Sequence, residues 1–418
     1  MRAVNRALSA PASTGKINGK GAPVSNSEHA ASNGHDKVTP PRGYTNEDSA
    51  HRREWLAKRT GVTISSGVFD EPEKLQGLIE NHVGYVGIPM SVAGPLKIAG
   101  SFAKGDFYVP LCTVEGTLSF SMTRGCYLTH LAGGITTRHF KQELSRAPVF
   151  IFSDMTQSVK FIDWVNLHFS EIKAAAESTT RHGRLLRIDK YPAHNRVILD
   201  FVYNTAEAAG QNMVTIGTDK ACRWILGEVQ HLGPVRYLVE SNFSGDKNPT
   251  HRTLLHGRGH QVIASFTVPE RLLRKVLRVG VDDVIQCATD KQLGSQLAGV
   301  LGFNLHVANG LAAIYLATGQ DVACVTENAV GITTFDRRGE NLFATLTMPS
   351  ITVGTVGGAT RLLQQQNNLK LLGCAGEPDS SKKLAEIICA AALALEISLA
   401  GAIISNEFAA SHAKFGRK

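Results

Sequence analysis

Four polar side chains stand in sequence contexts that suit acid–base or charge-stabilising chemistry. Glu115 lies in TVEG between apolar segments, where a desolvated carboxyl would serve as a general acid. Lys247 lies in the turn SNFSGDKNP, where an ammonium group held in a cleft would stabilise an oxyanion. Asp321 ends a segment without charged residues and therefore requires a partner such as a lysine. His412 stands in EFAASHAKFGRK, and imidazole suits proton transfer near neutral pH.

Taken singly, these residues also fit plain structural roles. Glu115 fits an acid at a helix start, Lys247 a solvated turn lysine, and His412 an exposed histidine near the basic end of the chain. Two glycine-containing segments, GTVGGAT (354–360) and AEAAGQNMVT (206–215), allow close backbone approach or anion binding at a helix start. Neither has the Walker or GxGxxG spacing, and we predict no metal site.

Composition narrows the class of protein. The 418 residues are 43% hydrophobic and 19% charged, which excludes fibrous and wholly disordered chains. The formal charge of +8 is spread along the chain, which favours phosphorylated small molecules over nucleic acid as partners. Seven cysteines without a CxxC pair indicate a reduced compartment, so we predict a cytoplasmic protein.

Two long apolar stretches require a membrane test. Residues 292–320 contain no Asp, Glu, Lys or Arg, but several amides would fall at mid-bilayer, where unsatisfied polar groups are costly. This stretch is predicted to be a buried helix of the core. The Ala-rich stretch 387–406 is interrupted by Glu396 and is also predicted to be a core helix, so we predict no membrane span.

The patterns along the chain predict an α+β fold with a large mixed domain around a buried central helix. Between about 147 and 240 the elements alternate as β-α-β-β-α-β, which is the split βαβ pattern of a small ferredoxin-like domain inserted in the larger one. A charged helix is expected after Pro40, with Asn46 or Asp48 as its cap. The predicted parts are a disordered leader (1–39), a helical portion with the first part of the substrate domain (40–147), the small nucleotide-binding domain (148–238), and the remainder of the catalytic domain with a mobile tail (239–418).

Nine segments, taken in order, resemble the soluble catalytic portion of 3-hydroxy-3-methylglutaryl-CoA reductases of the eukaryotic and archaeal class. The resemblance covers the chain from about residue 40 to its end. It is carried by NHVGYVGIPMSVAGPL, VPLCTVEGTLSFSMTRGC, LSRAPV, STTRHGRL, NTAEAAGQNM, SNFSGDKNP, HVANGLAAIYLATGQD, TMPSITVGTVGGAT and EFAASHAKFGR.

The resemblance implies the reduction of hydroxymethylglutaryl-CoA to mevalonate with NADPH, for isoprenoid synthesis. By motif match, Lys247 holds the oxyanion, Asp321 keeps that lysine charged, Glu115 donates a proton to the aldehyde oxygen, and His412 protonates the departing thiolate. Lys220 in GTDKAC matches a different helix of the family and is given no catalytic role.

The resemblance also implies the binding residues and the assembly. Positions matching those at or near the acyl substrate are Arg146, Asp246, Ser121, Arg124 and His306. Positions matching the nucleotide contacts are Thr180, Arg181, Glu207, Gly210 and Asn212, with Arg184 and Arg187 beside Arg181 as a cluster for a 2′-phosphate. A homodimer or homotetramer with its active site at the dimer interface is expected.

Several residues depart from the family pattern. Glu240 replaces a serine, Asn248 replaces the lysine after the catalytic one, Thr123 replaces an asparagine, and Ala359 replaces a glycine. In addition, the family's DAMGMN becomes EAAGQN at 207–212. These changes keep two alternatives open: a reductase of a different acyl-CoA, and a non-catalytic homologue that binds CoA or nucleotide.

Overall fold

The computed structural model describes residues 38–41, 45–63, 72–81, 85–233 and 235–406 of the 418-residue chain. The predicted leader (1–39) therefore falls almost wholly outside the described residues. The C-terminal segment that carries His412 falls outside them entirely.

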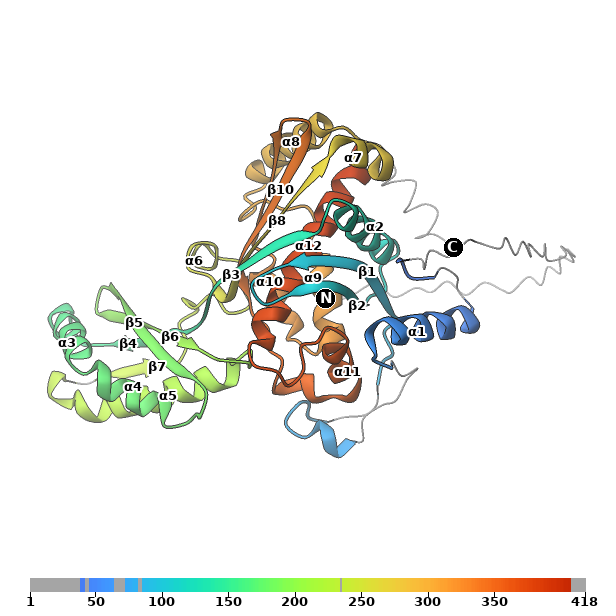
Figure 1. Cartoon of the computed structure of the whole chain (residues 1–418). Helices are drawn as coiled ribbons and strands as arrows, with labels where there is room; N and C mark the ends of the chain where they lie inside the picture. The colour runs from blue at the N-terminus through green and yellow to red at the C-terminus, as the bar shows by residue number, and fades with distance from the viewer. Residues whose placement is uncertain (1–37, 42–44, 64–71, 82–84, 234, 407–418) are drawn as a thin grey trace, which may run out of the picture. The chain divides into compact units, whose positions relative to one another are not determined.

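Ten strands of the described chain form one mostly antiparallel sheet (Figure 1). Its path runs β7-β4-β6-β3-β8-β10-β9, with β1 and β2 joined through β3 and with β5 paired to β6. Strand β3 connects the two halves, since residues 136–143 pair with β8 and residues 144–146 pair with β6. The strands are β1 (Met90–Ala99), β2 (Lys104–Cys112), β3 (Ile135–Arg146), β4 (Val149–Ile151), β5 (Arg184–Ala193), β6 (Arg196–Asn204), β7 (Arg236–Leu238), β8 (Arg258–Pro269), β9 (Ile332–Arg338) and β10 (Asn341–Ile351).

The elements between 149 and 238 form a group that we call the small lobe. Its strands lie in the order β5-β6-β4-β7, and each neighbouring pair is antiparallel. Three helices belong to the group: α3 (Met155–Leu167), α4 (Phe169–Glu177) and α5 (Gln211–Glu228). Helix α5 buries Val214, Thr218, Ala221 and Ile225, which recur every three or four residues along one face. The small lobe thereby has a hydrophobic core of its own.

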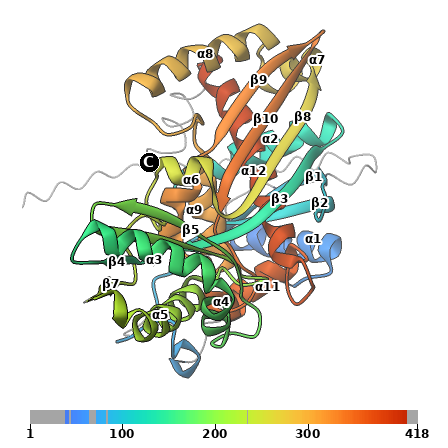
Figure 2. The ribbon, with the colours of Figure 1, turned by 90° about the vertical axis from the view of Figure 1, so that its left-hand side faces the viewer.

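The main lobe comprises the other described elements, and its strands β8, β10 and β9 lie side by side in that order with antiparallel pairing (Figure 2). Its larger helices are α1 (Asn46–Thr60), α2 (Leu118–Leu131), α7 (Glu270–Leu277), α8 (Val281–Leu297), α9 (Val307–Thr318), α11 (Leu363–Leu371) and α12 (Ser380–Ile404). Its shorter ones are α6 (His251–Leu255), α10 (Val325–Asn328) and the 3-10 turns η1 (Pro72–Leu75), η3 (Val322–Cys324) and η4 (Gly358–Arg361), while η2 (Gln230–Leu232) lies in the small lobe. The mixed helix-and-strand class predicted from the sequence is confirmed.

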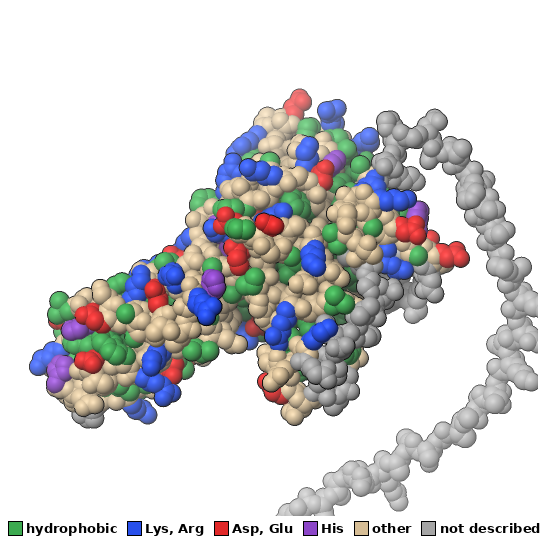
Figure 3. All heavy atoms as spheres, turned by 60° about the horizontal axis from the view of Figure 1, so that its bottom comes forward, with side chains coloured by type: hydrophobic (Ala, Val, Ile, Leu, Met, Phe, Trp, Pro, Cys, Tyr) green, Lys and Arg blue, Asp and Glu red, His purple; other side chains and the backbone are tan. Residues whose placement is uncertain are grey.

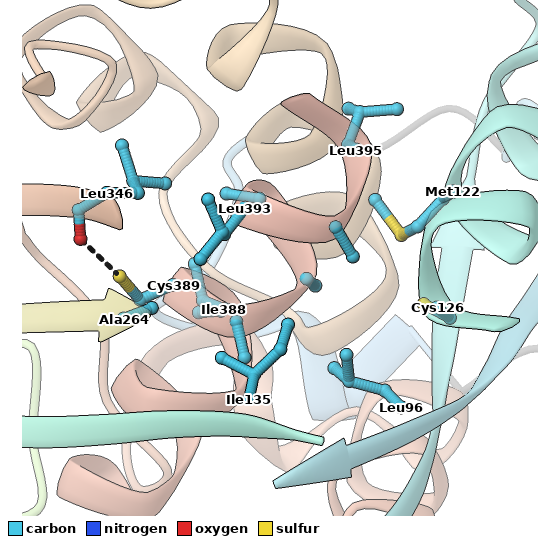
Figure 4. Packing of buried hydrophobic residues seen from close by; sticks show 14 of the residues in the cluster. Leu96, Met122, Cys126, Ile135, Ala264, Leu346, Ile388, Cys389, Leu393 and Leu395 are labelled. Atoms are coloured by element: carbon cyan, nitrogen blue, oxygen red, sulfur yellow. Dashed lines mark hydrogen bonds between the residues drawn. The ribbon is translucent and has the colours of Figure 1, made fainter. Parts of the chain in front are cut away.

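Helix α12 is the centre of the main lobe, which confirms the core helix predicted over 387–406. It contacts α2, α9 and the strands β3, β8 and β10. Figure 4 shows Ile388 and Leu393 of this helix among core side chains, and the Sγ of Cys389 lies 3.7 Å from the carbonyl oxygen of Leu346. Among the described helices, α12 alone has the length and hydropathy of a membrane span, but 89% of its apolar window is buried inside the fold. That burial is the property of a core helix.

Two buried carboxylates of α12 bind backbone N–H groups from distant parts of the chain. Glu386 accepts hydrogen bonds of 2.8–3.1 Å from the N–H groups of residues 101, 102 and 103, between β1 and β2. Glu396 accepts bonds of 2.7 Å from the N–H groups of Leu305 and His306, and one of 3.0 Å from the Thr333 hydroxyl. Burial raises the pKa of Glu396, and these donors oppose that rise.

Two predictions about helix limits are wrong. The charge-free stretch 292–320 is not one buried helix: it contains the largely exposed end of α8, a loop, and the buried α9. The chain turns there because Gly299 and Gly302 adopt left-handed backbone angles (φ 72° and 75°) that end the helical path. The cap of α1 is also different, since Thr45 and Asp48 form a capping box in which Thr45 is the N-cap.

The surface carries both signs of charge. On the face drawn in Figure 3, Lys and Arg side chains are interspersed with Asp and Glu. The basic side chains therefore do not gather in one patch on this face.

The contact of α2 with α12 yields a stability prediction. A Cβ on Gly125 of α2 would collide with the carbonyl oxygen of Ala394 in α12, which is backbone and cannot rotate away. We expect Gly125→Ala to lower the free energy of unfolding by about 3 kcal/mol through overpacking. Gly227→Ala is the matched control, because a Cβ at this helical glycine meets nothing within 4 Å. Chemical denaturation should show the control unchanged or more stable by about 0.5 kcal/mol, and equal losses in both variants would contradict the account.

A histidine pair between β3 and β8 yields a prediction on acid stability. His139 Nε2 lies 2.9 Å from His260 Nδ1, and burial, with a smaller contribution from His139, lowers the pKa of His260 from 6.5 to about 3. Since the unfolded chain takes up this proton below pH 6.5, stability is present at neutral pH and declines as the pH falls toward 3, by about 1.4 kcal/mol per pH unit. Denaturation as a function of pH should show a shallower decline in His260→Gln. The exposed control His231→Gln should keep the parent slope.

Candidate active site

Lys247 and Asp321 form an ion pair. Lys247 lies in the turn between β7 and α6 with a left-handed backbone (φ 58°), and Asp321 follows the end of α9, where it caps η3. The Lys247 Nζ lies 3.0 Å from Asp321 Oδ2, so the structure supplies the cationic partner that the sequence predicted for this aspartate. The hydrogen bond to Asp321 raises the pKa of Lys247, which keeps the ammonium group charged. Both side chains are partly exposed, at 49% and 38%, so solvent and a substrate can reach them.

Glu115 is held near the opposite end of α9. Its backbone N–H donates to the hydroxyl of Thr113 at 3.0 Å, and its Oε1 accepts a bond of 3.2 Å from the Asn309 side chain. Asn309 lies in the first turn of α9 and Asp321 just beyond its last residue, Thr318, so the two lie roughly 13 Å or more apart along the helix axis. Within one chain, these contacts do not bring Glu115 to the Lys247–Asp321 pair.

Arg146 lies at the end of β3 and is only 8% exposed. One of its terminal nitrogens, NH1, lies 2.7 Å from Glu240 Oε2. The other, NH2, lies 3.2 Å from Asp246 Oδ2. Asp246, which directly precedes Lys247, thus connects the turn that carries Lys247 to β3.

Arg258 extends this network into the core. It is fully buried, and its guanidinium lies 2.9 Å from Glu327 Oε1 and 3.2 Å from Asp246 Oδ1. Gln211, the first residue of α5, accepts a hydrogen bond of 2.7 Å from the same guanidinium. Burial raises the pKa of Glu327, and the nearby Arg258 opposes that rise. We call this set of ionic contacts the arginine network.

Three side chains of types that can bind a metal ion lie inside the arginine network. Donor atoms of Asp246, Cys324 and Glu327 all lie within 4.8 Å of one another. Arg258 pairs with both carboxylates, and burial raises the pKa of the Cys324 thiol, which disfavours the thiolate that would bind a metal. The guanidinium therefore supplies the positive charge at this position.

The other predicted acyl-site residues lie along the central helix. The hydroxyl oxygen of Ser121 lies 3.1 Å from that of Ser398, and the Nε of Arg124 donates to the same Ser398 hydroxyl at 3.0 Å. His306 stands at the start of α9, where its backbone N–H donates to Glu396. These three residues are therefore positioned by contacts to α12.

Four of the five predicted nucleotide residues gather around the start of α5. The Thr180 hydroxyl contacts the sulfur of Met213 at 3.0 Å, which brings the exposed Arg181 beside this helix start. Gly210 is the N-cap (φ 84°) without a side-chain cap, and Asn212 is exposed in the first turn. The fifth residue, Glu207, faces α12.

The contacts of Glu207 and of Arg187 limit their availability to a nucleotide. Glu207 accepts hydrogen bonds of 2.7–3.0 Å from Asp379 N, Ser380 Oγ and Ser381 N at the start of α12. Arg187 forms a two-point ion pair with Glu143 at 2.8 and 3.1 Å, and also contacts Asp189. A phosphate contact at Arg187 would have to replace those partners.

Comparisons with known proteins extend over most of the chain. Residues 48–417 match the hydroxymethylglutaryl-coenzyme A reductase family. The 3-hydroxy-3-methylglutaryl-coenzyme A reductase of Methanocaldococcus jannaschii is 39% identical over 373 residues, which cover 88% of this chain and 92% of that protein. The enzyme of the same name from Pyrococcus horikoshii is 40% identical over 401 residues, 92% of this chain and 96% of that protein.

The chain belongs to the hydroxymethylglutaryl-coenzyme A reductase family. It is therefore an oxidoreductase, and the resemblance stated from the nine sequence segments is confirmed. The class II 3-hydroxy-3-methylglutaryl-CoA reductase of Streptococcus pneumoniae, solved bound to NADPH, matches with a TM-score of 0.63 at 19% identity, over 79% of this chain and 88% of that one. At that identity, the structural match establishes the fold.

Sequence reasoning missed part of this reductase's network. Arg258 and Glu327 were not singled out, although their charges stand in the segments HGRGHQVIASF and VACVTENAVG, which are otherwise mostly uncharged. A buried charge needs an opposite charge, so an arginine and a glutamate in such surroundings are a usable signal for a pair. The signal does not identify the partner, because the two residues lie 69 positions apart.

The buried pair predicts a large loss of stability. Glu327→Gln should leave the guanidinium of Arg258 without its closest carboxylate and lower the free energy of unfolding by about 3 kcal/mol. The matched control is Asp282→Asn, since Asp282 forms an exposed pair with Arg337 and its loss should cost less than about 1 kcal/mol. Urea denaturation of both variants measures the difference, and a cost for Glu327→Gln as small as that of the control would refute the buried-pair account.

Proposed function

We propose that this reductase converts 3-hydroxy-3-methylglutaryl-CoA to mevalonate and free CoA, with two NADPH, as a step toward isoprenoid precursors. The observation that carries the proposal is the Lys247–Asp321 ion pair at 3.0 Å, in a chain matched by the reductase family over 48–417. A charged lysine beside a carboxylate, open to solvent, is suited to stabilise the oxyanion of a carbonyl that accepts a hydride.

The roles proposed for four residues rest on the motif match, and the chemistry of their side chains supports them. Lys247 donates hydrogen bonds to the carbonyl oxygen as charge develops there, and Asp321 orients that ammonium group. When the hemithioacetal collapses, the C–S bond breaks and His412 gives its proton to the leaving thiolate of CoA. Glu115 donates a proton to the oxygen of the aldehyde as the alcohol forms. His412 is proposed on its motif alone, since it lies outside the described residues.

The start of α5 fits a nicotinamide dinucleotide. Its first-turn N–H groups have no side-chain cap, and Thr180 and Arg181 lie beside them, so donors and a cation are available for phosphates. When bound, NADPH supplies the hydride. The chain's part is to hold the phosphates with Arg181 and the helix start, with Gly210 and Asn212 allowing a close approach. Glu207 is proposed to act indirectly, by fastening the loop before α5 to α12.

The acyl group is proposed to bind along the arginine network and α2. Arg146 and Asp246 are placed next to Lys247, while Ser121 and Arg124 are fixed to α12, with His306 at the start of α9. A reductase of a different acyl-CoA remains a second candidate, because Glu240 already occupies Arg146. The non-catalytic alternative has less support, since a protein that only binds has no need for a charged Lys247–Asp321 pair.

We propose that the small lobe is a ferredoxin-like domain inserted at 148–238. Its strand order β5-β6-β4-β7 and its antiparallel pairings are those expected for a split βαβ domain. We propose that residues 40–147 and 239–418 together form the large domain, and that residues 1–39 form a leader. A cytoplasmic location is proposed from the seven free cysteines, five of them buried.

A homodimer with shared active sites is supported by the position of Glu115. In one chain this residue is held near the start of α9, whereas the Lys247–Asp321 pair follows its end. A second copy that presents Glu115 to this pair would bring the acid and the oxyanion lysine together. A dimer, or a tetramer built from two dimers, fits this requirement.

The proposal predicts the stoichiometry of the reaction. Purified protein mixed with hydroxymethylglutaryl-CoA and NADPH should oxidise two NADPH for each thiol released. Lys247→Asn should lower kcat about 100-fold or more, because the oxyanion loses its cation. Asparagine is chosen because it tolerates the left-handed backbone at this position, so the turn is preserved.

Lys220→Asn is the control for charge, since Lys220 is an exposed lysine on α5. It should retain the activity of the parent. Absence of turnover by the folded parent protein, with NADPH and with NADH, would sink the proposed function.

A further inference from the structure

The guanidinium of Arg146 is occupied on both sides by the chain's own carboxylates. Its NH1 lies 2.7 Å from Glu240 Oε2, and its NH2 lies 3.2 Å from Asp246 Oδ2. The arginine side chain is 8% exposed, so these contacts lie in a region of low solvent access where charge pairs are strong. An incoming carboxylate that needs Arg146 must therefore displace one of them.

Glu240 is held in place by the backbone. The N–H and the hydroxyl of Ser241 both donate to the carbonyl oxygen of Ala147, at 2.9 and 2.7 Å. These two residues directly follow Glu240 and Arg146, so the ion pair is fixed where the chain enters and leaves the small lobe. The Ser244 hydroxyl also donates to Glu240 Oε2, at 2.9 Å.

The second oxygen of Glu240 is unused by the protein. Glu240 Oε1 is buried and has no hydrogen-bond partner within the described part of the chain. A buried acceptor of this kind favours a ligand group that donates a hydrogen bond, such as a hydroxyl, and it repels a carboxylate.

The paired charges around Arg146 and Lys247 include more carboxylates than cations. The cations Lys247, Arg146 and Arg258 are each paired, and together they face four carboxylates: Asp321, Glu240, Asp246 and Glu327. The residue after Lys247 is the uncharged Asn248. Its side-chain amide donates a hydrogen bond to the backbone oxygen of Asp246 at 2.9 Å. A further negative charge placed here would meet net repulsion.

We propose that Glu240 is a specificity residue that weakens the preference of this reductase for a distal carboxylate on the acyl chain, so that an uncharged hydroxyacyl-CoA becomes a further substrate beside hydroxymethylglutaryl-CoA. It acts by holding Arg146, which a substrate carboxylate could otherwise use, and by offering Oε1 to a hydroxyl donor. This inference rests on the proposed acyl-CoA reductase function. It predicts that the parent protein reduces 3-hydroxy-3-methylbutanoyl-CoA, which has the same chain without the carboxylate, more efficiently relative to hydroxymethylglutaryl-CoA than the Glu240 variants do.

The test compares both thioesters in the parent protein, Glu240→Ser and Glu240→Gln. The ratio of kcat/KM for hydroxymethylglutaryl-CoA to that for the uncharged thioester should rise about tenfold in both variants, because a like charge near the distal group has been removed. The change should lie mainly in KM, since among the described residues the ion pair of Glu240 is with Arg146 and that of Lys247 is with Asp321. Glutamine keeps the size of the side chain, so a rise in the serine variant alone would mean that space matters and would overturn the proposal.

Glu228→Ser is the matched control, because Glu228 is an exposed residue at the end of α5. It changes the net charge by the same amount and should leave the ratio unaltered. A ratio unchanged in both Glu240 variants, in protein that does turn over, would refute the specificity role while leaving the reductase function intact. If no variant turns over either thioester, calorimetry of hydroxymethylglutaryl-CoA binding decides: tighter binding by Glu240→Ser upholds the role of Glu240, and equal binding rejects it.

Discussion

The structure depends on the burial of helix α12 and on two carboxylates that this helix carries into the core. A carboxylate without partners is costly to bury, so Glu386 and Glu396 require the N–H groups of distant loops to converge on them. Glu386 fixes the turn between β1 and β2, and Glu396 fixes the start of α9. Because Asn309 of α9 contacts Glu115 and Asp321 follows the end of this helix, α12 indirectly positions residues proposed for catalysis.

Local patterns predicted the parts of the fold that depend on local chemistry. The apolar stretch 387–406 could be identified because an Ala-rich run of twenty residues with one charge is too long for a typical strand and favours a helix, and burial followed from hydropathy. The need of Asp321 for a cation was predictable for a similar reason, since a charge beside an apolar segment implies a partner. Lys247 emerged as that partner only through the motif match and the observed distance.

Longer-range features could not be predicted from one sequence. Nothing local indicates that Glu207 faces the start of α12, or that Gln211 lies between two arginines, because these contacts depend on how the two lobes meet. The stretch 292–320 was misjudged because its composition suits a helix throughout, whereas Gly299 and Gly302 bend the chain away. Composition describes the average environment, and a single left-handed glycine can override it.

The closeness of the two ends of the small lobe has a further consequence for the evolution of such proteins. The chain enters the small lobe after Ala147 and returns at Ser241, and these two residues are hydrogen bonded, so the inserted segment begins and ends at one point of the main lobe. Arg146 and Glu240 flank this junction. A recombination event that exchanges this inserted segment would, depending on whether its end falls before or after residue 240, also carry or discard Glu240. The carboxylate that pairs with Arg146 is therefore genetically linked to the small lobe.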